Sequence, residues 1–442
     1  MRRQCRAGHG AVSRSFSSPG AFLVCTILLS TTCTHGGRPA AVPQSAAPSP
    51  APATSASPSP EPVLGQPVHW INGYLHTAGT QLVTADNHPV RLLGMGITGM
   101  QQGSGTPNTE PQPYSGCLGW HTPDPAAYGQ IRSWGFNSIR LPVSWANLEP
   151  VPPTIGSDGK LVHHWNRPYL KALDGIVNGF ARQGIATIID MNQVRWSPAF
   201  THIPLPSGGK VCGTGMPAWL YPGQHGLGAL AEAEEDFFIR DRGHVQERFI
   251  DAWTFLVRHY RTQRMFIGAD ILCEGYDILV TSYPGGTKLL PRDIDLQGFY
   301  EKVGAAIHAA NPNLLLMFED NRSKRTSRWS VVGKPRLPNA VLSAHYYPAV
   351  WKAPEGLPRL RAYVKRARGW DLPLWLGEFN VFRYTTSFPF EPTWARDGRE
   401  FLDYARENDI SWTIWAYGSG QFLVKGTTDP KPGVVEVLRK GF

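Results

Sequence analysis

The sequence has no glycine-rich phosphate loop after a predicted strand, and it has no CxxC or paired-histidine spacing. Because such patterns hold nucleotides and metal ions, we expect neither a cofactor nor a metal. Acidic residues are absent from residues 1–60, where five arginines supply more than half of the net charge of +9. The rest of the chain therefore carries too little excess charge to require a nucleic acid or another polyanion as partner.

Long hydrophobic runs are also absent. The apolar stretch 21–29 follows an arginine-bearing segment and is too short to span a bilayer. We expect residues 1–33 to be a signal peptide or a lipoprotein signal, and the Pro/Ala/Ser-rich residues 34–64 to be an extended linker. Cys33 resembles the acylated cysteine of a bacterial lipoprotein. Secretion and lipid anchoring at the bacterial cell surface are both open, and that anchor is the only membrane contact we expect.

Cysteine is scarce, with six residues in the chain. Cys117 and Cys212 lie in long loops rich in Gly and Pro, and in an exported protein they could form one disulfide. Cys273 is predicted to be a free thiol. The remaining three cysteines lie within the predicted signal.

The body of the chain, residues 65–442, alternates predicted strands with helices. Residues 68–90 predict a small N-terminal β-hairpin with turns at Asn72-Gly73 and Asp86-Asn87. Eight strand candidates follow, at 91–95, 138–141, 186–190, 267–272, 314–318, 341–344, 374–376 and 411–415. Helical periodicity is clearest at 169–183, 244–260, 297–310 and 394–408. The pattern predicts an α/β fold, a (β/α)8 TIM barrel with long loop insertions, and a doubly wound open sheet is the alternative.

Two glutamates end short apolar runs. Glu274 ends the run that begins at Ile267, and Glu378 ends the run that begins at Leu374. Carboxylates at the C-terminal ends of barrel strands are placed where such folds carry their catalytic groups. A converging pair about 5–5.5 Å apart is what retaining glycoside hydrolysis needs. Taken singly, each could instead be a solvated glutamate at the start of a loop.

Several strand motifs resemble those of glycoside hydrolase family 5, the cellulase-like barrels. The resemblance runs from about residue 68 to the C-terminus, in the order expected for the family. Its motifs are Gly135-Phe-Asn-Ser-Ile-Arg140-Leu-Pro-Val-Ser-Trp145, Val341-Leu-Ser-Ala-His345-Tyr-Tyr347-Pro, Leu374-Trp-Leu-Gly-Glu378-Phe and Thr413-Ile-Trp415. Finer features, such as Asp190-Met-Asn192-Gln193, are similar to the endoglycoceramidase branch.

The resemblance implies catalytic roles for the two glutamates. Glu274 matches the acid/base, which must hold a proton for the leaving oxygen, so we expect its pocket to favour the protonated form. Glu378 matches the nucleophile and must be ionised. Arg140 matches an arginine beside the nucleophile, where a guanidinium favours the carboxylate form.

Substrate contacts follow from the same resemblance. His345 and Tyr347 match paired contacts of the family, with Tyr347 placed to donate a hydrogen bond to Glu378. Trp415 matches the aromatic floor under the sugar, whose C–H face stacks on an indole. A purely structural role in the core is the alternative for His345 and Tyr347.

Two positions depart from the family pattern among the predicted substrate contacts. Cys273 stands where the family has an asparagine that bonds the sugar 2-hydroxyl, and a thiol is a weak hydrogen-bonding group. Asn192 stands where the third strand usually ends in histidine. The residue after Glu274 is Gly275 in place of the usual proline. These changes imply altered recognition of the 2-hydroxyl.

Three functions remain open for a carbohydrate or glycoconjugate substrate. The first is an exported retaining β-glycoside hydrolase that acts by double displacement. The second is a non-catalytic carbohydrate-binding barrel. The third is a glycolipid-directed endoglycosidase, in which the long insertion between Asn192 and Arg242 would help form an apolar site for the aglycone.

Overall fold

The computed structural model describes residues 70–442 except for the segments 111–116, 195, 201, 205–209, 222–231, 235, 242, 275–294, 321–331, 348–355, 381–391, 419–421, 425–426 and 440. The predicted signal and the predicted linker both lie outside the described residues, so those two expectations stay predictions.

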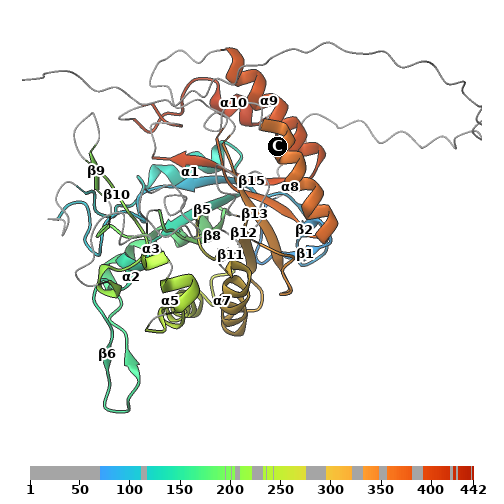
Figure 1. The fold of residues 1–442 in the computed structure, drawn as a ribbon. Coiled ribbons are helices and arrows are strands. Elements are labelled where there is room, and N and C mark those ends of the chain that lie inside the picture. Colours follow the sequence, from blue (N-terminus) through green and yellow to red (C-terminus); the bar gives the residue numbers. More distant parts are fainter. Residues whose placement is uncertain are drawn as a thin grey trace, which may run out of the picture. The chain divides into compact units, whose positions relative to one another are not determined.

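Within the described residues, eight parallel strands close into a barrel (Figure 1). Each strand pairs with the next one in the chain, and β15 closes the ring against β4. The strands are β4 (Leu93–Ile97), β5 (Ser138–Val143), β8 (Ala186–Met191), β11 (Phe266–Asp270), β12 (Leu315–Glu319), β13 (Ala340–Tyr346), β14 (Leu374–Phe379) and β15 (Ser411–Tyr417). The predicted (β/α)8 barrel is confirmed, and its closure rules out the open sheet.

Helices surround this barrel because parallel neighbours are joined by crossover connections (Figure 1). They are α1 (Ala126–Ser133), α3 (Arg167–Arg182), α5 (Val245–His259), α7 (Leu296–Ala310), α8 (Gly356–Trp370), α9 (Pro392–Glu407) and α10 (Val434–Arg439). Shorter turns are α2 (Trp145–Leu148), the 3-10 helix η1 (Ala218–Leu220) and the π-helix η2 (Asp236–Arg240). The four predicted helices are all present. The start of α3 is fixed by Asn166, whose side chain accepts a hydrogen bond from the Tyr169 N–H at 3.2 Å.

A small antiparallel sheet precedes the barrel. It consists of β1 (His76–Ala78), β2 (Gln81–Val83) and β3 (Pro89–Val90). The predicted turn at Asp86-Asn87 is present, with Asn87 in the left-handed region at φ 64°. The turn of the first hairpin lies at Gly79-Thr80, not at Asn72-Gly73, because Gly79 at φ 61° supplies the positive φ that this tight reversal needs.

This sheet packs against the N-terminal end of the barrel. Leu82 and Val90 share one apolar cluster with inward-facing residues of the barrel strands, among them Ile188, Leu315 and Trp375. Burying these side chains closes the end of the barrel opposite the strand C-termini. The small sheet therefore leaves the C-terminal end of the barrel as the face available to a ligand.

Residues alternate between the inside and the outside of each barrel strand. On β12, Leu315 and Met317 belong to the inner cluster, whereas Leu316 and Phe318 pack outward against the helices. Because this period is two, the next inward residue is Glu319. The same alternation turns Arg140 of β5, Asp190 of β8 and His345 of β13 toward the barrel axis, whereas Ile139, Ile189 and Ala344 pack outward.

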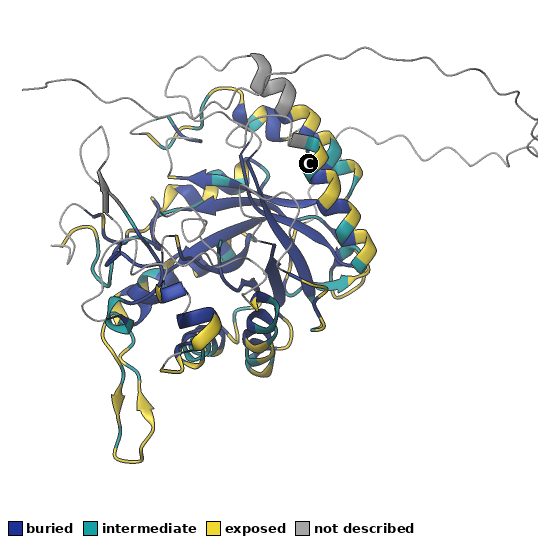
Figure 2. Cartoon of the chain, in the orientation of Figure 1, coloured by how far each residue is buried: buried dark blue, intermediate teal, exposed yellow. Residues whose placement is uncertain are grey.

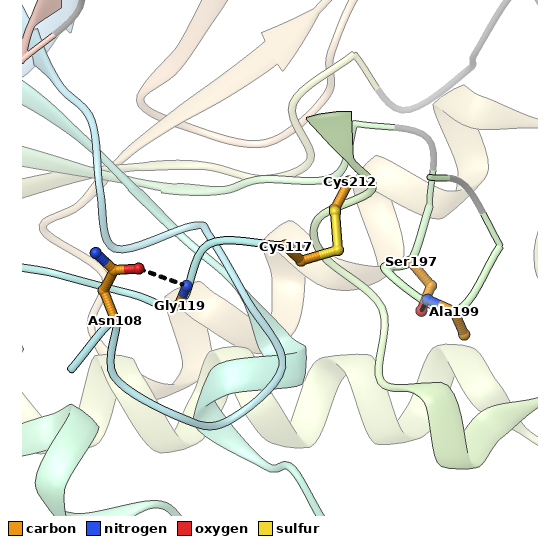
Figure 3. The surroundings of a disulfide bond; sticks show 6 residues. All are labelled: Asn108, Cys117, Gly119, Ser197, Ala199 and Cys212. Carbon is orange, nitrogen blue, oxygen red and sulfur yellow. Dashed lines mark hydrogen bonds between the residues drawn. A yellow bond between two sulfur atoms is a disulfide. The ribbon is translucent and has the colours of Figure 1, made fainter. Parts of the chain in front are cut away.

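A disulfide joins two of the long loops that connect the barrel elements. Cys117 and Cys212 are bonded, with their Cα atoms 5.7 Å apart (Figure 3). In the segment of Cys117, the Gly119 N–H donates to the Asn108 side chain at 3.3 Å (Figure 3). The pairing that the sequence left open is thus confirmed, and Cys273 is a buried free thiol.

Removing this disulfide is expected to destabilise the protein. The two cysteines are 95 residues apart in the chain, so the bond restricts a long loop of the unfolded state. We expect a variant carrying Cys117→Ser and Cys212→Ser to lose about 2–5 kcal/mol of unfolding free energy. Urea denaturation measures this change, and reduction of the wild type with dithiothreitol serves as the control. Equal midpoints for the oxidised and reduced wild type would contradict the prediction.

A second hairpin follows β5. It is built from β6 (Thr154–Ile155) and β7 (Leu161–Val162), and it extends away from the barrel with both strands exposed (Figure 2). Another pair of short strands, β9 (His202–Pro204) and β10 (Lys210–Cys212), follows β8. The pair β9 and β10 lies in the insertion between Asn192 and Arg242 that the sequence predicted. No helix in the described part of the chain is both long and apolar enough to cross a membrane.

Candidate active site

The two predicted carboxylates face a common histidine at the C-terminal end of the barrel. His345 Nδ1 lies 2.9 Å from Glu274 Oε1 and 3.6 Å from Glu378 Oε2. Strands β13 and β14 produce this arrangement, because His345 and Glu378 are direct partners in the parallel register. The Glu274 side chain is 36% exposed and that of Glu378 only 9%. Glu274 is therefore the member of the pair that is more accessible to solvent.

Arg140 is a buried cation that holds Glu378. Its Nη1 donates to Glu378 Oε1 at 2.6 Å, and its Nε donates to Asp270 Oδ2 at 2.8 Å. A third contact, from Nη2 to Asp190 Oδ2, measures 3.2 Å. Arg140 is completely buried, so its charge must be matched within the protein. Its predicted place beside Glu378 is confirmed by these contacts.

The other oxygen of Glu378 is bonded by Tyr347. The Tyr347 hydroxyl donates to Glu378 Oε2 at 2.5 Å, as the sequence predicted. Cys273 approaches the opposite oxygen, with Sγ 4.0 Å from Glu378 Oε1. Burial, reinforced by the charge of Asp190, raises the pKa of the Cys273 thiol well above its ordinary value. Cys273 is therefore a neutral and weak hydrogen-bond donor beside the carboxylate.

The peptide of Glu274 is fixed on both sides by side chains. Glu274 has φ 42°, a left-handed conformation that costs a residue with a side chain about 1–2 kcal/mol. Its N–H donates to Glu319 Oε2 at 2.9 Å, and its carbonyl oxygen accepts from Gln193 Nε2. The glutamate lies in a turn after β11, which ends at Asp270, rather than in the strand itself.

Both polar atoms of the Asn192 side chain contact other side chains of the protein. Its Oδ1 accepts from the Thr214 hydroxyl at 2.6 Å, and its Nδ2 lies 3.4 Å from Asp190 Oδ2. The residue is buried. Its predicted contact with substrate stays a prediction. The neighbouring Gln193 does reach the site, because it bonds the carbonyl oxygens of both Cys273 and Glu274.

Trp415 lies on β15, and its side chain is half-buried. The peptide bond between Trp415 and Ala416 is cis. Its indole packs over Gly96 of β4, where a Cβ would come within 2.8 Å of Trp415 Cε3. The Trp415 carbonyl oxygen accepts from Asn380, two residues after Glu378, at 2.7 Å. The residue is thus fixed near the end of β14, while its sugar-stacking role stays a prediction.

Three carboxylates of this site were not among the predicted site residues. They are Asp190, Asp270 and Glu319, each at or next to the end of a barrel strand and each buried. The signal that identified Glu274 and Glu378, an acidic residue closing an apolar run, was equally present for Glu319. What the sequence lacked was the pairing that brings Asp190 and Asp270 to one guanidinium.

The carboxylates change the proton affinity of the site. Burial lowers the pKa of His345, but the charges of Glu319, Glu378 and Glu274 outweigh it and raise the pKa to about 10. Burial raises the pKa of Glu319 to about 8, although the charge of His345 opposes this shift. Both groups therefore bind protons more tightly in the folded protein than their ordinary pKa values of 6.5 and 4.5 imply.

The stability of the protein is expected to fall as the pH rises. A group whose pKa is raised by folding stabilises the native state while it is protonated, and this contribution is lost as the pH passes its folded pKa. For His345 the loss extends from about pH 6.5 to about pH 10, and Glu319 acts in the same direction. We expect the melting temperature to decrease across this range in scanning calorimetry, and an increase would contradict the prediction.

Three of these residues also bring possible metal ligands together. Ligand atoms of Cys273, His345 and Glu378 lie within 4.8 Å of one another. Both oxygens of Glu378 are already engaged, one by Arg140 and one by Tyr347. A cation here would share these oxygens with Arg140 and Tyr347, and the expectation that the protein needs no metal stays a prediction.

The fold and site together define a class of protein. A closed (β/α)8 barrel carries two glutamates that both approach His345 at the C-terminal end of the barrel, and one of them is held by an arginine and a tyrosine. This is the arrangement of barrel enzymes that cleave glycosidic bonds.

The family is shown by comparison with known families. Residues 99–421 match the model of Cellulase (glycosyl hydrolase family 5), which covers well over half of the chain. The chain belongs to glycosyl hydrolase family 5. It is a glycoside hydrolase that acts on O-glycosyl bonds of a carbohydrate or glycoconjugate.

Solved structures with the same fold include enzymes named for two substrate classes. An endogalactoceramidase is 22% identical with a TM-score of 0.59, over 78% of this chain and 75% of that one. The endo-glycoceramidase II of Rhodococcus sp., solved as a lactosyl-enzyme intermediate, is 19% identical with a TM-score of 0.60, over 83% and 81%. A hyperthermostable endocellulase is 17% identical with a TM-score of 0.52, over 84% and 98%. At these identities the likeness concerns the fold.

Proposed function

We propose that this glycoside hydrolase is an exported retaining enzyme that cleaves β-glycosidic bonds by double displacement. One observation carries the proposal, namely that Glu274 and Glu378 share a single imidazole nitrogen of His345. A retaining pair needs carboxyl groups about 5–5.5 Å apart, a spacing that two carboxylates around one nitrogen can adopt.

In the first step, Glu378 attacks the anomeric carbon and Glu274 gives its proton to the departing glycosidic oxygen. The bond to the aglycone breaks as the glycosyl ester of Glu378 forms. Arg140 and Tyr347 each hold one oxygen of Glu378 and so fix the direction of the attack. The greater exposure of Glu274 fits a group that must meet the leaving oxygen.

In the second step, Glu274 acts as the base. It takes a proton from a water molecule, whose oxygen attacks the anomeric carbon and releases Glu378 as a carboxylate. The two inversions restore the starting β-configuration. Trp415, the Cys273 thiol and Asn192 border the sugar in this scheme.

Export is proposed on two grounds. The disulfide between Cys117 and Cys212 suits an oxidising compartment. The apolar stretch within residues 1–33 has the pattern of a secretion signal. We propose that the mature enzyme is either secreted or anchored at the cell surface through a lipid on Cys33. Mass spectrometry of the mature N-terminus distinguishes the two outcomes.

A glycolipid is a second candidate substrate. The observation that favours it is the likeness to an endogalactoceramidase and to endo-glycoceramidase II over more than three quarters of this chain. In this version the aglycone is apolar, and the insertion between β8 and α5 borders its site. The catalytic roles of Glu274 and Glu378 are unchanged.

A substrate screen tests the proposed function. It compares aryl β-glycosides, β-glucans, mannans and glycosphingolipids, and proton NMR follows the anomer released first. We expect turnover with initial release of the β-anomer. Initial release of the α-anomer from a β-glycoside would show inversion and overturn the double-displacement proposal. Release of an intact oligosaccharide from glycosphingolipids alone would select the glycolipid version.

Replacing Cys273 by asparagine is expected to change substrate preference. Its Sγ lies 4.0 Å from Glu378, so an amide at this position would lie beside the sugar attacked there. One added hydrogen bond to an equatorial 2-hydroxyl is worth about 1 kcal/mol. We expect Cys273→Asn to raise kcat/KM on such substrates by about a few-fold to tens-fold. The measurement is steady-state kinetics on paired substrates with and without that hydroxyl, with Cys273→Ser as the size-matched control.

Two results would contradict this expectation in different ways. If the wild type turns over well and Cys273→Asn destroys activity, the thiol is suited to a sugar that lacks the usual 2-hydroxyl contact. If the wild type is inert on every glycoside and a Cys273→Asn, Asn192→His variant turns over, the natural protein is a sugar-binding barrel.

A further inference from the structure

Glu319 is a buried carboxylate that has no role in the two catalytic steps proposed above. It is the last residue of β12 and is 1% exposed. Its side chain faces the end of the barrel that holds Glu274 and Glu378. A carboxylate so deeply buried is costly unless its oxygens have partners, so its contacts indicate what it does.

The first contact is with the backbone of Glu274. Glu319 Oε2 accepts the Glu274 N–H at 2.9 Å. Glu274 has the unfavourable φ of 42°, which must be maintained by its surroundings. This hydrogen bond is available in either protonation state of Glu319, because a protonated carboxyl group keeps an acceptor oxygen. Glu319 therefore stabilises the backbone conformation that turns Glu274 toward the site.

The second contact is with His345. Glu319 Oε1 lies 3.6 Å from His345 Nε2, while His345 Nδ1 lies 2.9 Å from Glu274 Oε1. The imidazole thus stands between two carboxylates, one on each ring nitrogen. A carboxylate behind a histidine orients the ring and favours its charged form.

We propose that Glu319 is a positioning residue for the acid/base, which it holds through the peptide N–H of Glu274 and through the ring of His345. This inference rests on the proposed role of Glu274 as the acid/base. Glu319 touches neither sugar nor leaving group in this scheme. It acts on catalysis only by fixing where the Glu274 carboxyl lies.

The charge of Glu319 bears on the pH dependence of the site. Glu319 is the largest of the charges that raise the pKa of His345, so its loss should lower that pKa. The groups that face Glu319 are His345 on β13, Glu274 after β11, Asp270 on β11 and Arg140 on β5. All four groups remain in a Glu319→Gln variant, and the loss of a negative charge lowers the pKa of its titratable neighbours, so we expect the alkaline limb of the activity profile to shift to lower pH.

The experiment uses two substitutions in the full-length protein. Glu319→Gln keeps an oxygen acceptor for the Glu274 N–H but removes the charge, and Glu319→Ala removes both. Substrates are aryl β-lactosides with good (dinitrophenyl) and poor (phenyl) leaving groups. We expect Glu319→Ala to lower kcat/KM on the substrate with the poor leaving group by about tenfold to a hundredfold more than on the other substrate. The reason is that a misplaced Glu274 carboxyl no longer gives its proton efficiently to the leaving oxygen, and only the poor leaving group needs that proton. Glu319→Gln should show a smaller loss and the shifted alkaline limb.

Two control variants separate the possible failures. Asp320→Asn changes the adjacent buried carboxylate, which pairs with Arg366 of α8, and it should leave the leaving-group dependence unchanged. Glu274→Gln should show the strongest leaving-group dependence of the set. If Glu274→Gln lacks that dependence, the proposed acid/base role fails. If Glu274→Gln has it and Glu319→Ala loses activity equally on both substrates, Glu319 is merely structural and this inference fails.

A crystal structure tests the positioning role of Glu319 independently of enzyme activity. In a crystal structure of the Glu319→Ala protein, we expect the backbone of Glu274 to leave the left-handed region and its carboxyl to move away from His345. A Glu274 that keeps its φ near 42° and its contact with His345 would overturn the positioning role.

Discussion

Turnover is expected to fall by at least about 10⁴-fold when Glu378 is replaced by glutamine, the scale of loss for a covalent nucleophile. The amide has nearly the same shape as the carboxylate, but it cannot form the glycosyl ester. The amide oxygen can still accept from Arg140 and the amide NH2 can donate to the Tyr347 hydroxyl, so the site should remain folded. The measurement is kcat on the best substrate of the screen, with circular dichroism to verify the fold. Glu247→Gln on the exposed face of α5 is the control, and it should leave kcat unchanged.

A smaller side chain at the same position identifies the role of Glu378 directly. In Glu378→Gly, added azide can occupy the space of the lost carboxylate and attack the anomeric carbon from that side. One displacement inverts the centre, so a β-glycoside should give an α-glycosyl azide. If the product is the β-glycosyl azide, Glu274 formed the glycosyl ester first and azide displaced it from the side of the lost Glu378 carboxylate, so the two roles are exchanged. Full activity of Glu378→Gln would reject the nucleophile assignment altogether.

The second large effect concerns stability. We expect Arg140→Met to lower the unfolding free energy by about 3–5 kcal/mol, because it leaves buried carboxylates without their cation. The guanidinium contacts Glu378, Asp270 and Asp190 and is itself fully buried. Methionine fills a similar volume, so the loss is mainly electrostatic. Urea denaturation provides the measurement.

Buffer pH distinguishes this electrostatic loss from a packing defect. Protonated carboxyls need no cation, so the destabilisation by Arg140→Met should be smaller in mildly acidic than in alkaline buffer. Burial already raises the pKa of Asp190, which favours this proton uptake. Arg258→Met, on an exposed position of α5, should change stability by no more than about 0.5 kcal/mol. A loss for Arg140→Met that does not depend on pH would mean that packing, not charge, is responsible.

Local patterns in the sequence were sufficient to predict the barrel architecture. Short apolar runs closed by turn-formers gave all eight barrel strands, although β4, β5, β13 and β15 end two residues and β14 three residues beyond the predicted ends, and β11 ends two residues before its predicted end. The reason is that strand length is decided by pairing with neighbours, which a single run of residues does not contain. The first hairpin turn was misplaced for a similar reason. Asn72-Gly73 and Gly79-Thr80 are both turn-forming pairs, and only the pairing of β1 with β2 selects the latter.

The sequence by itself determined that the chain forms a (β/α)8 barrel and that Glu274 and Glu378 close two of its apolar runs, whereas the places of Arg140, His345 and Tyr347 came from the resemblance to glycoside hydrolase family 5. Period-two alternation and position at a strand end are local properties, and they suffice to place a side chain on a face. Only the tertiary structure decided which of these groups touch. It joined Cys117 to Cys212 across 95 residues, gave Arg140 three carboxylates from three strands, and placed Glu319 against the peptide of Glu274. Such contacts depend on the register and closure of the barrel, because strands distant in the chain meet only once the ring is complete.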